Sequence, residues 1–226
     1  MAMGLNRLID AKLDARNPRT QRRELPRGAI QRAEAWAIVL SAALLYFVSA
    51  AAIAPICLRL SPIPVALFVI YPYLKRFTSL SHLGLGLAWS MAPLGGWIAA
   101  GGSLARLREI TWLWLFSVLW VAGFDIIYAT MDEAFDRAAG LHSLPVRLGR
   151  RRALTAAAVL HGLAFLALTE LWRHRLTSLS STLWLGAIGL LLVVEHLIAE
   201  RFPEHAFFHV NSLLGFLVFG FVFTGM

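Results

Sequence analysis

Charged residues are scarce in this chain. Only 15% of its 226 residues are charged, against roughly a quarter in an ordinary soluble domain, and 58% are hydrophobic. The one cysteine, Cys57, lies in an apolar run and leaves no basis for a disulfide scaffold. No cluster of cysteine and histidine suits zinc, and the first 32 residues contain no apolar core for a signal peptide. These absences argue against a water-soluble globule.

Long apolar stretches make up most of the sequence. Little remains for an extramembrane domain, so we expect an all-α membrane protein, a multi-pass bundle of about seven helices, with residues 1–226 forming one transmembrane domain. The stretch at 62–74 is the weakest crossing, because about 13 residues are short for a full span. The expected crossings lie near 36–57, 62–74, 84–101, 111–129, 153–171, 182–198 and 207–225.

The basic residues are unevenly divided between the two sides of these crossings. The formal net charge is +8, and alternate loops carry 16 lysines and arginines on one side against 5 on the other. This asymmetry predicts that the richer side, which includes the N-terminal segment, faces the cytoplasm across the cell (inner) membrane. A nucleic-acid-binding protein needs one basic face on a folded domain, so we expect no nucleic-acid partner.

All five aspartates of the chain fall in two sets. Asn6, Asp10 and Asp14 recur every four residues and would share one face of a helix. Four apolar stretches separate this first set from the second, an even number, so both emerge on the same side of the membrane and can face each other. The second set is expected to form one stripe as well and comprises Asp125, Tyr128, Asp132 and Asp136.

Carboxylates beside or inside apolar runs are costly unless they are paired, by roughly 2.5 kcal/mol or more. Two such sets at one depth favour a cation site over a solvated helix face. Their oxygen ligands suit Mg²⁺, which is usually completed by water and substrate phosphates. We therefore predict Mg²⁺ as cofactor, together with a diphosphate whose remaining charge nearby cations offset. Lys75 is the first choice, and the other candidates are Arg19, Arg22, Arg23, Arg76, Arg137 and Arg147.

The two acidic sets and their flanks resemble the signatures of the UbiA-type intramembrane prenyltransferases. The first, at residues 6–20, reads NxxxDxxxD followed by NPRT. The second, at 123–145, reads GFDxxYxxxDxxxD followed by GLHSLP, and the middle segment at 71–78 reads YPYxKRFT. The resemblance covers nearly the whole chain. Its longer motifs look like the branch labelled 4-hydroxybenzoate polyprenyltransferase, which also contains menaquinone-pathway members.

That resemblance implies nine crossings around a cavity open to lipid, in which the two aspartate motifs hold Mg²⁺ and a polyprenyl diphosphate. Metal ligands would be Asp10, Asp14, Asp132 and Asp136. Together with Asp125 and Tyr128, placed beside the reacting carbon or the acceptor, these four form the predicted catalytic set. The predicted substrate-binding residues are Asn6, Arg19, Arg23, Tyr73, Lys75 and Arg137.

The predicted reaction is Mg²⁺-dependent transfer of a polyprenyl group from polyprenyl diphosphate to 4-hydroxybenzoate or a related aromatic acid, in ubiquinone or menaquinone biosynthesis. An allylic cation favours aromatic walls, and Tyr71, Tyr73, Trp120 and Tyr128 are candidates for them. A cation transporter is the alternative, although arginine-rich loops repel cations and attract phosphate. An inactive truncated prenyltransferase is a third reading.

Three polar residues lie within the last two apolar runs, where they have no obvious place in this reaction. Membrane helices use such side chains to hydrogen-bond to one another. We therefore expect interhelical hydrogen bonds from Glu195, His196 and Asn211.

The family pattern places two transmembrane helices up to the first motif, whereas only five residues precede Asn6. Roughly 60 residues, the length of two crossings and a turn, are missing from that pattern. We therefore expect this sequence to lack the N-terminal helix and most of the second, and the 226-residue polypeptide alone to be inactive or poorly folded. An assay of this form with polyprenyl diphosphate and Mg²⁺ checks the expectation, and robust turnover would contradict it.

Overall fold

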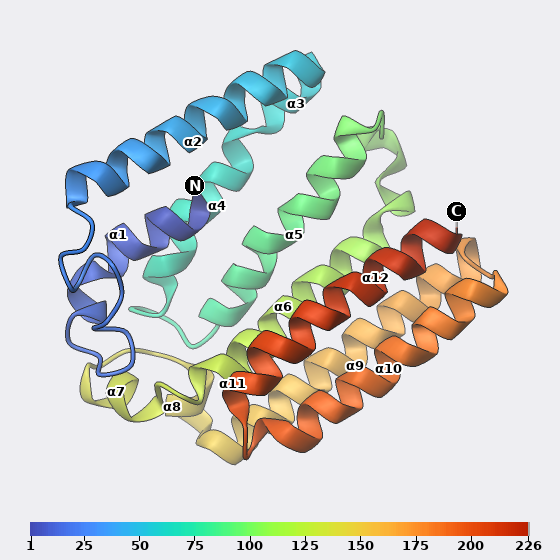
Figure 1. The fold of residues 1–226 in the computed structure, drawn as a ribbon. Coiled ribbons are helices and arrows are strands. Elements are labelled where there is room, and N and C mark those ends of the chain that lie inside the picture. The colour runs from blue at the N-terminus through green and yellow to red at the C-terminus, as the bar shows by residue number, and fades with distance from the viewer. Residues whose placement is uncertain (226) are drawn as a thin grey trace.

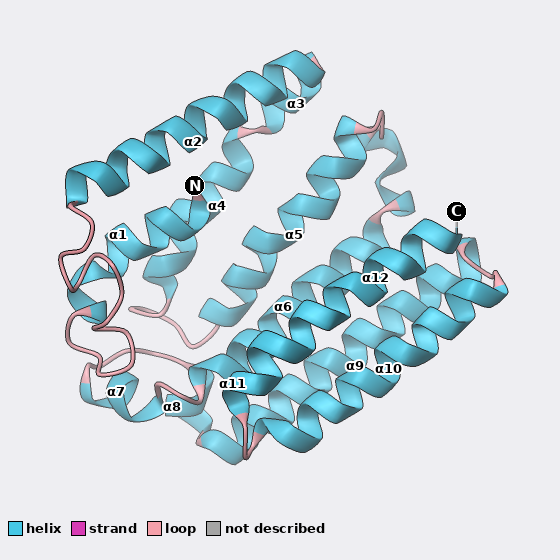
Figure 2. Ribbon diagram, viewed as in Figure 1, coloured by secondary structure: helices cyan, strands magenta, loops and turns pink. Residues whose placement is uncertain are grey.

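The computed structural model describes residues 1–225, which fold into helices joined by loops and contain no strand (Figures 1 and 2). A 3-10 helix covers Leu104–Glu109, and a π-helix, a turn one residue wider than an α-helix, covers Ala206–Val210. The remaining helices are α1 (Ala2–Asp14), α2 (Arg32–Ile53), α3 (Pro55–Leu60), α4 (Pro62–Leu74), α5 (Ser81–Ala99), α6 (Thr111–Ala129), α7 (Glu133–Ala138), α8 (Leu144–Leu148), α9 (Arg150–Arg175), α10 (Leu179–Ala199), α11 (Pro203–His205) and α12 (Asn211–Gly225).

Six helical segments within residues 1–225 are long and apolar enough to cross a membrane, which confirms the all-α membrane fold. One more crossing was expected, at 84–101. It corresponds to α5, which has 19 residues but is less apolar than the six. Figure 1 shows α5 running between α4 and α6. The six segments are Arg32–Ile53, Pro55–Leu74, Thr111–Ala129, Arg150–Arg175, Leu179–Ala199 and Pro203–Gly225.

The boundary between the first two crossings differs from the predicted one. The first apolar run was expected to continue to residue 57, but α2 ends at Ile53, and Ala54 is extended with φ −165° and ψ 151°. The cause is Pro55, because a residue that precedes proline is pushed out of the helical region. A new helix begins at Pro55 and continues into α4, so the second crossing spans 20 residues instead of 13.

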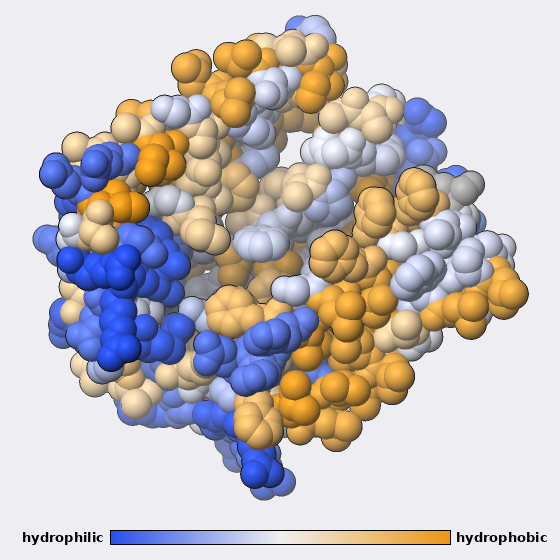
Figure 3. Space-filling view, viewed as in Figure 1, coloured by the Kyte–Doolittle hydropathy of each residue, from blue (hydrophilic) through white to orange (hydrophobic). Residues whose placement is uncertain are grey.

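The helices enclose two regions of different character. On one side, α6, α9, α10 and α12 pack around a buried apolar core that includes Phe116, Leu168, Ile188 and Phe221. On the other side, α1 packs against α2 through a smaller core. Hydrophilic residues gather at the end of the molecule where the loop at residues 15–31 and α7 lie (Figure 3). The two acidic sets lie at this polar end.

Two glycines allow α6 to approach its neighbours closely. A Cβ added at Gly86 of α5 would overlap the backbone carbonyl of Val118 in α6, and one added at Gly123 of α6 would overlap the ring of His161 in α9. Small residues at such contacts let helix backbones pack closely where no hydrophobic effect drives association between membrane helices. The contacts fix α6 between α5 and α9.

We expect Gly86→Ala to destabilise the protein by about 1–3 kcal/mol, because the new methyl group forces α5 away from α6. Gly95→Ala is a matched control in the same helix, since nothing lies within 4 Å of a Cβ added there. Removing a helical glycine at that position should be neutral or slightly stabilising. Thermal unfolding in detergent measures both variants, and equal melting temperatures would contradict the assigned contact.

Candidate active site

A cavity of about 1440 Å³ lies between α1, α4, α5 and α6. Its lining is polar at the end near the loop at residues 15–31, where Asp10, Lys75 and Asp125 contribute. Toward the opposite ends of α2 and α5 the lining is apolar and includes Ile53 and Leu104. The cavity can therefore accept a molecule with a charged head and a long hydrocarbon tail.

The first acidic set occupies one face of α1, as its spacing predicts. Asn6, Asp10 and Asp14 all line the cavity. The two aspartates are buried, with only 5% and 7% of their surfaces exposed. Burial of these carboxylates requires compensating cations or hydrogen bonds.

The second acidic set does not form the single helical stripe that was predicted. Helix α6 ends at Ala129, and Asp132 stands just before α7. The chain leaves the helix in a tight turn, in which the Met131 and Asp132 amides donate to the carbonyls of Tyr128 and Ala129. The Thr130 hydroxyl donates to the carbonyl of Ile127 at 2.7 Å. The turn still leaves the set at the cavity, whose lining includes Asp125, Tyr128, Asp132 and Asp136.

Two arginines from the loop at residues 15–31 join the acidic sets. Arg23 donates from Nη1 to both oxygens of Asp14, at 2.7 and 2.8 Å, and from Nη2 to the Tyr128 hydroxyl at 3.3 Å. Arg19 donates to the same hydroxyl at 2.6 Å, and binds Asp132 through Nε at 2.8 Å and through Nη2. A continuous chain of hydrogen bonds therefore connects α1 to the turn after α6.

Asn17 is a site residue that the sequence reasoning did not identify. Its Nδ2 donates to Oδ1 of Asp132 at 2.8 Å, and its Oδ1 accepts from the Arg19 amide at 3.0 Å. Burial alone would raise the pKa of Asp132, but the hydrogen bonds from Arg19 and Asn17 outweigh burial and lower that pKa. The sequence signal that could have identified Asn17 is its position at the start of the NPRT segment.

Asp136 and Lys75 differ from these paired residues. Burial raises the pKa of Asp136, although the positive charge of Lys75 acts in the opposite direction. Within residues 1–225, Lys75 forms no ion pair, so its ammonium group lines the cavity without a carboxylate partner. Its neighbour Arg76 instead binds Asp10 at 3.1 Å. Lys75 is thus the cation most readily offered to an incoming anion.

Two predicted substrate-binding residues lie elsewhere. Tyr73 is 39% exposed and lies against the guanidinium of Arg76, 4.8 Å from the ring centroid. It stands two residues from Lys75, and so on another face of α4. Arg137 is exposed and pairs with Glu133 at 2.9 Å. Neither residue lines the cavity, so the structure does not bring them to the predicted site.

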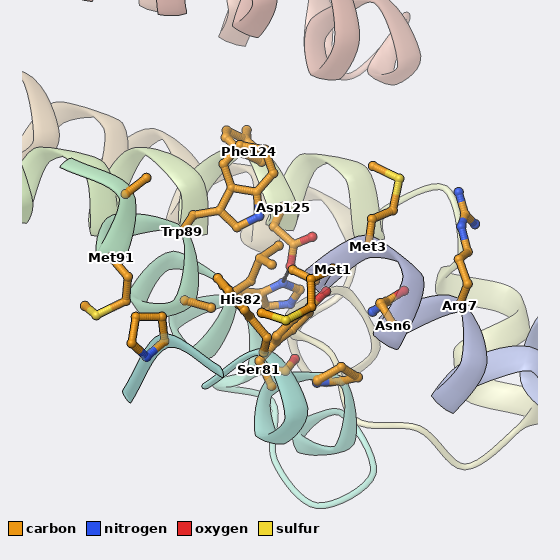
Figure 4. Close-up of a pocket in the computed structure, with 18 of the residues that line it drawn as sticks. Met1, Met3, Asn6, Arg7, Ser81, His82, Trp89, Met91, Phe124 and Asp125 are labelled. Carbon is orange, nitrogen blue, oxygen red and sulfur yellow. Dashed lines mark hydrogen bonds and ion pairs between the residues drawn. The ribbon is translucent and has the colours of Figure 1, made fainter. Parts of the chain in front are cut away.

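His82 of α5 is a second site residue outside the predicted set. It is buried, and its Nδ1 lies 2.7 Å from Oδ2 of Asp125, beside it in the cavity wall (Figure 4). Its Nε2 accepts the backbone N–H of Leu144 at 3.3 Å, so the ring hydrogen sits on Nδ1 and is donated to the carboxylate. His82 therefore orients Asp125 and leaves Oδ1 of Asp125 without a hydrogen bond within residues 1–225.

Aromatic rings cover the wall beyond Asp125. Phe124 lies edge-on to Trp89 and Trp120, with centroids 6.3 and 5.6 Å away. Tyr128 packs on Phe207 at 4.2 Å, and Phe207 packs on Phe124 at 5.4 Å. All five rings line the cavity, next to the hydroxyl that the two arginines hold.

The acidic side chains within residues 1–225 do not form a metal site by themselves. Within the described chain, no group of three or more histidine, cysteine, aspartate or glutamate side chains is close enough to hold a metal ion by itself. The donors that face the cavity are nevertheless hard carboxylate oxygens, which suit Mg²⁺ with its remaining positions filled by water and phosphate. The donor set therefore fits Mg²⁺ only together with a bound anion.

Comparison with known proteins identifies this arrangement. The profile of the UbiA prenyltransferase family matches residues 1–219. The chain belongs to the UbiA prenyltransferase family. The family and the class of enzyme that the sequence motifs predicted are thereby confirmed.

Individual UbiA relatives support the same placement. The chain is 30% identical to a 4-hydroxybenzoate octaprenyltransferase of Vibrio campbellii over 95% of its own length and 75% of that protein. With the enzyme of the same name from Vibrio atlanticus it shares 35% identity over 65% of this chain, and the match spans only about half, 51%, of that protein. A solved UbiA homologue from Aeropyrum pernix K1 is 34% identical and superposes with a TM-score of 0.85, over 96% of this chain and 83% of that one.

The pairing of Arg23 with Asp14 predicts a measurable coupling. We expect Arg23→Gln and Asp14→Asn each to destabilise the protein, and the double variant to lose less than their sum, with a coupling energy of about 1–3 kcal/mol. The exposed pair Arg173 and Glu170 is the control and should couple by less than about 0.5 kcal/mol. Unfolding in detergent measures both cycles, and equal coupling would contradict a special role for the buried pair.

Proposed function

We propose that this protein transfers a polyprenyl group from polyprenyl diphosphate to an aromatic acid, with 4-hydroxybenzoate as the first candidate. The observation that carries the proposal is that Arg19 and Arg23 join both acidic sets at the charged end of a cavity whose other end is apolar. An amphiphile with an anionic head fits this distribution. The name 4-hydroxybenzoate octaprenyltransferase, borne by relatives, supports the choice of acceptor.

The diphosphate would bind at the charged end. Arginine donates paired hydrogen bonds that suit phosphate as well as carboxylate, and the free ammonium of Lys75 adds a point charge. The proposal includes Mg²⁺, held by Asp10 and Asp14 on one side and by Asp132 and Asp136 on the other. When bound, it would neutralise the oxygens that gain charge as the diphosphate leaves.

The reaction breaks the bond between the allylic carbon and the diphosphate oxygen, and the electron pair leaves with the diphosphate. A ring carbon of the acceptor then forms a bond to the allylic carbon. The ring proton passes to Oδ1 of Asp125, which His82 holds in place through Oδ2. The aromatic faces of Phe124 and Tyr128 stabilise positive charge on the allylic carbon.

The same proposal fixes how the enzyme sits in the membrane. The excess of basic residues in the loops near the acidic sets supports a position of the charged end of the cavity at the cytoplasmic face of the cell membrane. The polyprenyl chain would then extend along the apolar lining toward the opposite leaflet, where Ile53 and Leu104 lie. The product belongs to the ubiquinone route, and a naphthoate-type acid of menaquinone routes is the second acceptor to test.

Asp10→Asn and Asp132→Asn should each lower kcat by at least about 100-fold. Each substitution removes a carboxylate charge that would hold Mg²⁺ beside the diphosphate leaving group. Glu133→Gln is the matched control, since Glu133 adjoins Asp132 but pairs with Arg137 outside the cavity. The gene is expressed with any in-frame coding sequence upstream of Met1 retained. Transfer of labelled polyprenyl from its diphosphate to each aromatic acid is measured in membranes with Mg²⁺.

Full turnover in both aspartate variants would contradict the assigned site. Absence of turnover by well-folded protein with every aromatic acid would contradict the proposed function. In that event, uptake of a divalent cation by vesicles containing the protein would favour the transporter alternative.

A further inference from the structure

Glu195 is an acidic residue that the proposed reaction does not use. It lies in α10, one of the membrane-spanning segments, and none of its surface is exposed. It does not line the cavity. A carboxyl group inside a membrane span is energetically costly, so it usually has a functional role. For Glu195, that role can be to hold other groups in place.

The anchored group is Asn211 at the start of α12. Its Nδ2 donates to Oε1 of Glu195 at 2.8 Å, and its Oδ1 accepts the indole N–H of Trp120 at 2.6 Å. Asn211 and Trp120 both line the cavity. Glu195 thus reaches the cavity wall through one intermediate residue.

His161 of α9 completes the surroundings of Glu195. Its Nε2 lies 3.0 Å from the backbone carbonyl of Trp120, which can only accept, so Nε2 carries a hydrogen. Its Nδ1 lies 3.3 Å from Oε2 of Glu195 and 3.0 Å from Nε2 of His196. The 3.3 Å approach is a close contact and not a hydrogen bond, because Oε2 of Glu195 has no hydrogen-bond partner within residues 1–225. Glu195 is therefore held through Oε1, which accepts from Asn211.

The same asparagine holds an irregular turn of the chain. The π-helix Ala206–Val210 precedes Asn211, whose Nδ2 lies 3.1 Å from the carbonyl oxygens of both Ala206 and Phe207. This turn brings Phe207 into the cavity wall against Tyr128. Turns of this kind occur frequently at functional sites.

We propose that Glu195 is a positioning residue of the prenyl-transfer site. Through Asn211 it fixes both the indole of Trp120 and the turn that carries Phe207, and so it sets the shape of the aromatic wall. The inference rests on the proposed function, because the wall matters only if an allylic cation forms beside it. The cation-bearing carbon of a polyprenyl substrate is the group that this wall would cover.

The wall has a second task, which is to exclude water. If water reaches the allylic carbon, its oxygen forms a bond to that carbon, the diphosphate leaves with the electron pair, and a proton is released. The product is then a prenyl alcohol instead of a prenylated acid. The ratio of prenylated acid to prenyl alcohol therefore reports the shape of the wall without reference to the overall rate.

Glu195→Leu removes both acceptors and should lower this product ratio on the order of 10-fold, since small misplacements at a reacting centre have effects of at least that size. The KM for polyprenyl diphosphate should stay within about 3-fold, because the diphosphate site is built from other residues. Glu195→Gln should restore the ratio to near the wild-type value. Its Oε1 can accept from Asn211 as the carboxylate does, so the link to Trp120 and to the turn is kept.

Two further variants make the test decisive. Glu170→Leu, at a partly exposed position on α9, is the control and should leave the ratio unchanged. Phe207→Leu acts on the wall directly and should lower the ratio while the network around Glu195 stays intact. If Glu195→Leu does not fold, Asn211→Leu breaks the same link to Trp120 and to the turn and should lower the ratio, and an unchanged ratio in that variant overturns the inference.

The outcomes separate the inference from the proposed function. A wild-type enzyme that makes no prenylated acid contradicts the proposed function itself. A wild-type enzyme that makes it, while Glu195→Leu is less stable but keeps the product ratio, overturns the inference, as does an unchanged ratio in Phe207→Leu. A lowered ratio in Glu195→Leu and Phe207→Leu, with recovery in Glu195→Gln, supports it.

Discussion

Carboxylates that are buried away from water need cations or hydrogen bonds to offset the cost of burial. The rest of this site depends on which groups supply them. Asp14 and Asp132 are held by Arg23 and Arg19, which come from the loop at residues 15–31 and not from α1 or the turn after α6, where the aspartates lie. The loop therefore connects α1 with the end of α6, and the Tyr128 hydroxyl receives a hydrogen bond from each arginine. The cations that hold the two acidic sets together are of the type that binds a diphosphate, so in the proposed function one set of charges would serve both stability and binding.

The helices supply rigidity where the loop supplies charge. Gly86 and Gly123 set α6 against α5 and α9 at distances that a side chain would not permit. His82, on α5, consequently reaches Asp125 on α6, and His161, on α9, reaches the backbone of α6 at Trp120. Close packing of three helices is thus the condition for both histidine contacts.

The spacing of residues in the sequence predicted the arrangement of an acidic set where all its members lie on one helix face. It failed where the chain turns. The four-residue spacing of Asp10 and Asp14 predicted their common face, whereas the turn after Ala129 is formed by local backbone hydrogen bonds that no periodicity reveals. Likewise, Ala54 breaks the first crossing because of Pro55, although both flanking stretches are apolar. Asn17 and His82 have partners 115 and 43 residues away, and only the folded structure brings such pairs together. The fold class and family followed from composition and motifs; the hydrogen-bonding partners did not.

The cavity face of α6 unites the two polar networks. Trp120, Phe124 and Tyr128 recur every four residues, and so lie along one face of the helix, which lines the cavity. At one end of this row, Tyr128 is held by the loop arginines that would bind the leaving group. At the other end, Trp120 is held by Asn211 and, through it, by Glu195. In the proposed reaction, a substrate lying along the row would have its diphosphate at the arginines and its first carbons against the rings. Because one rigid helix face sets the distance between these two contacts, it would also fix the point at which the carbon–oxygen bond breaks relative to the wall that shields the resulting cation.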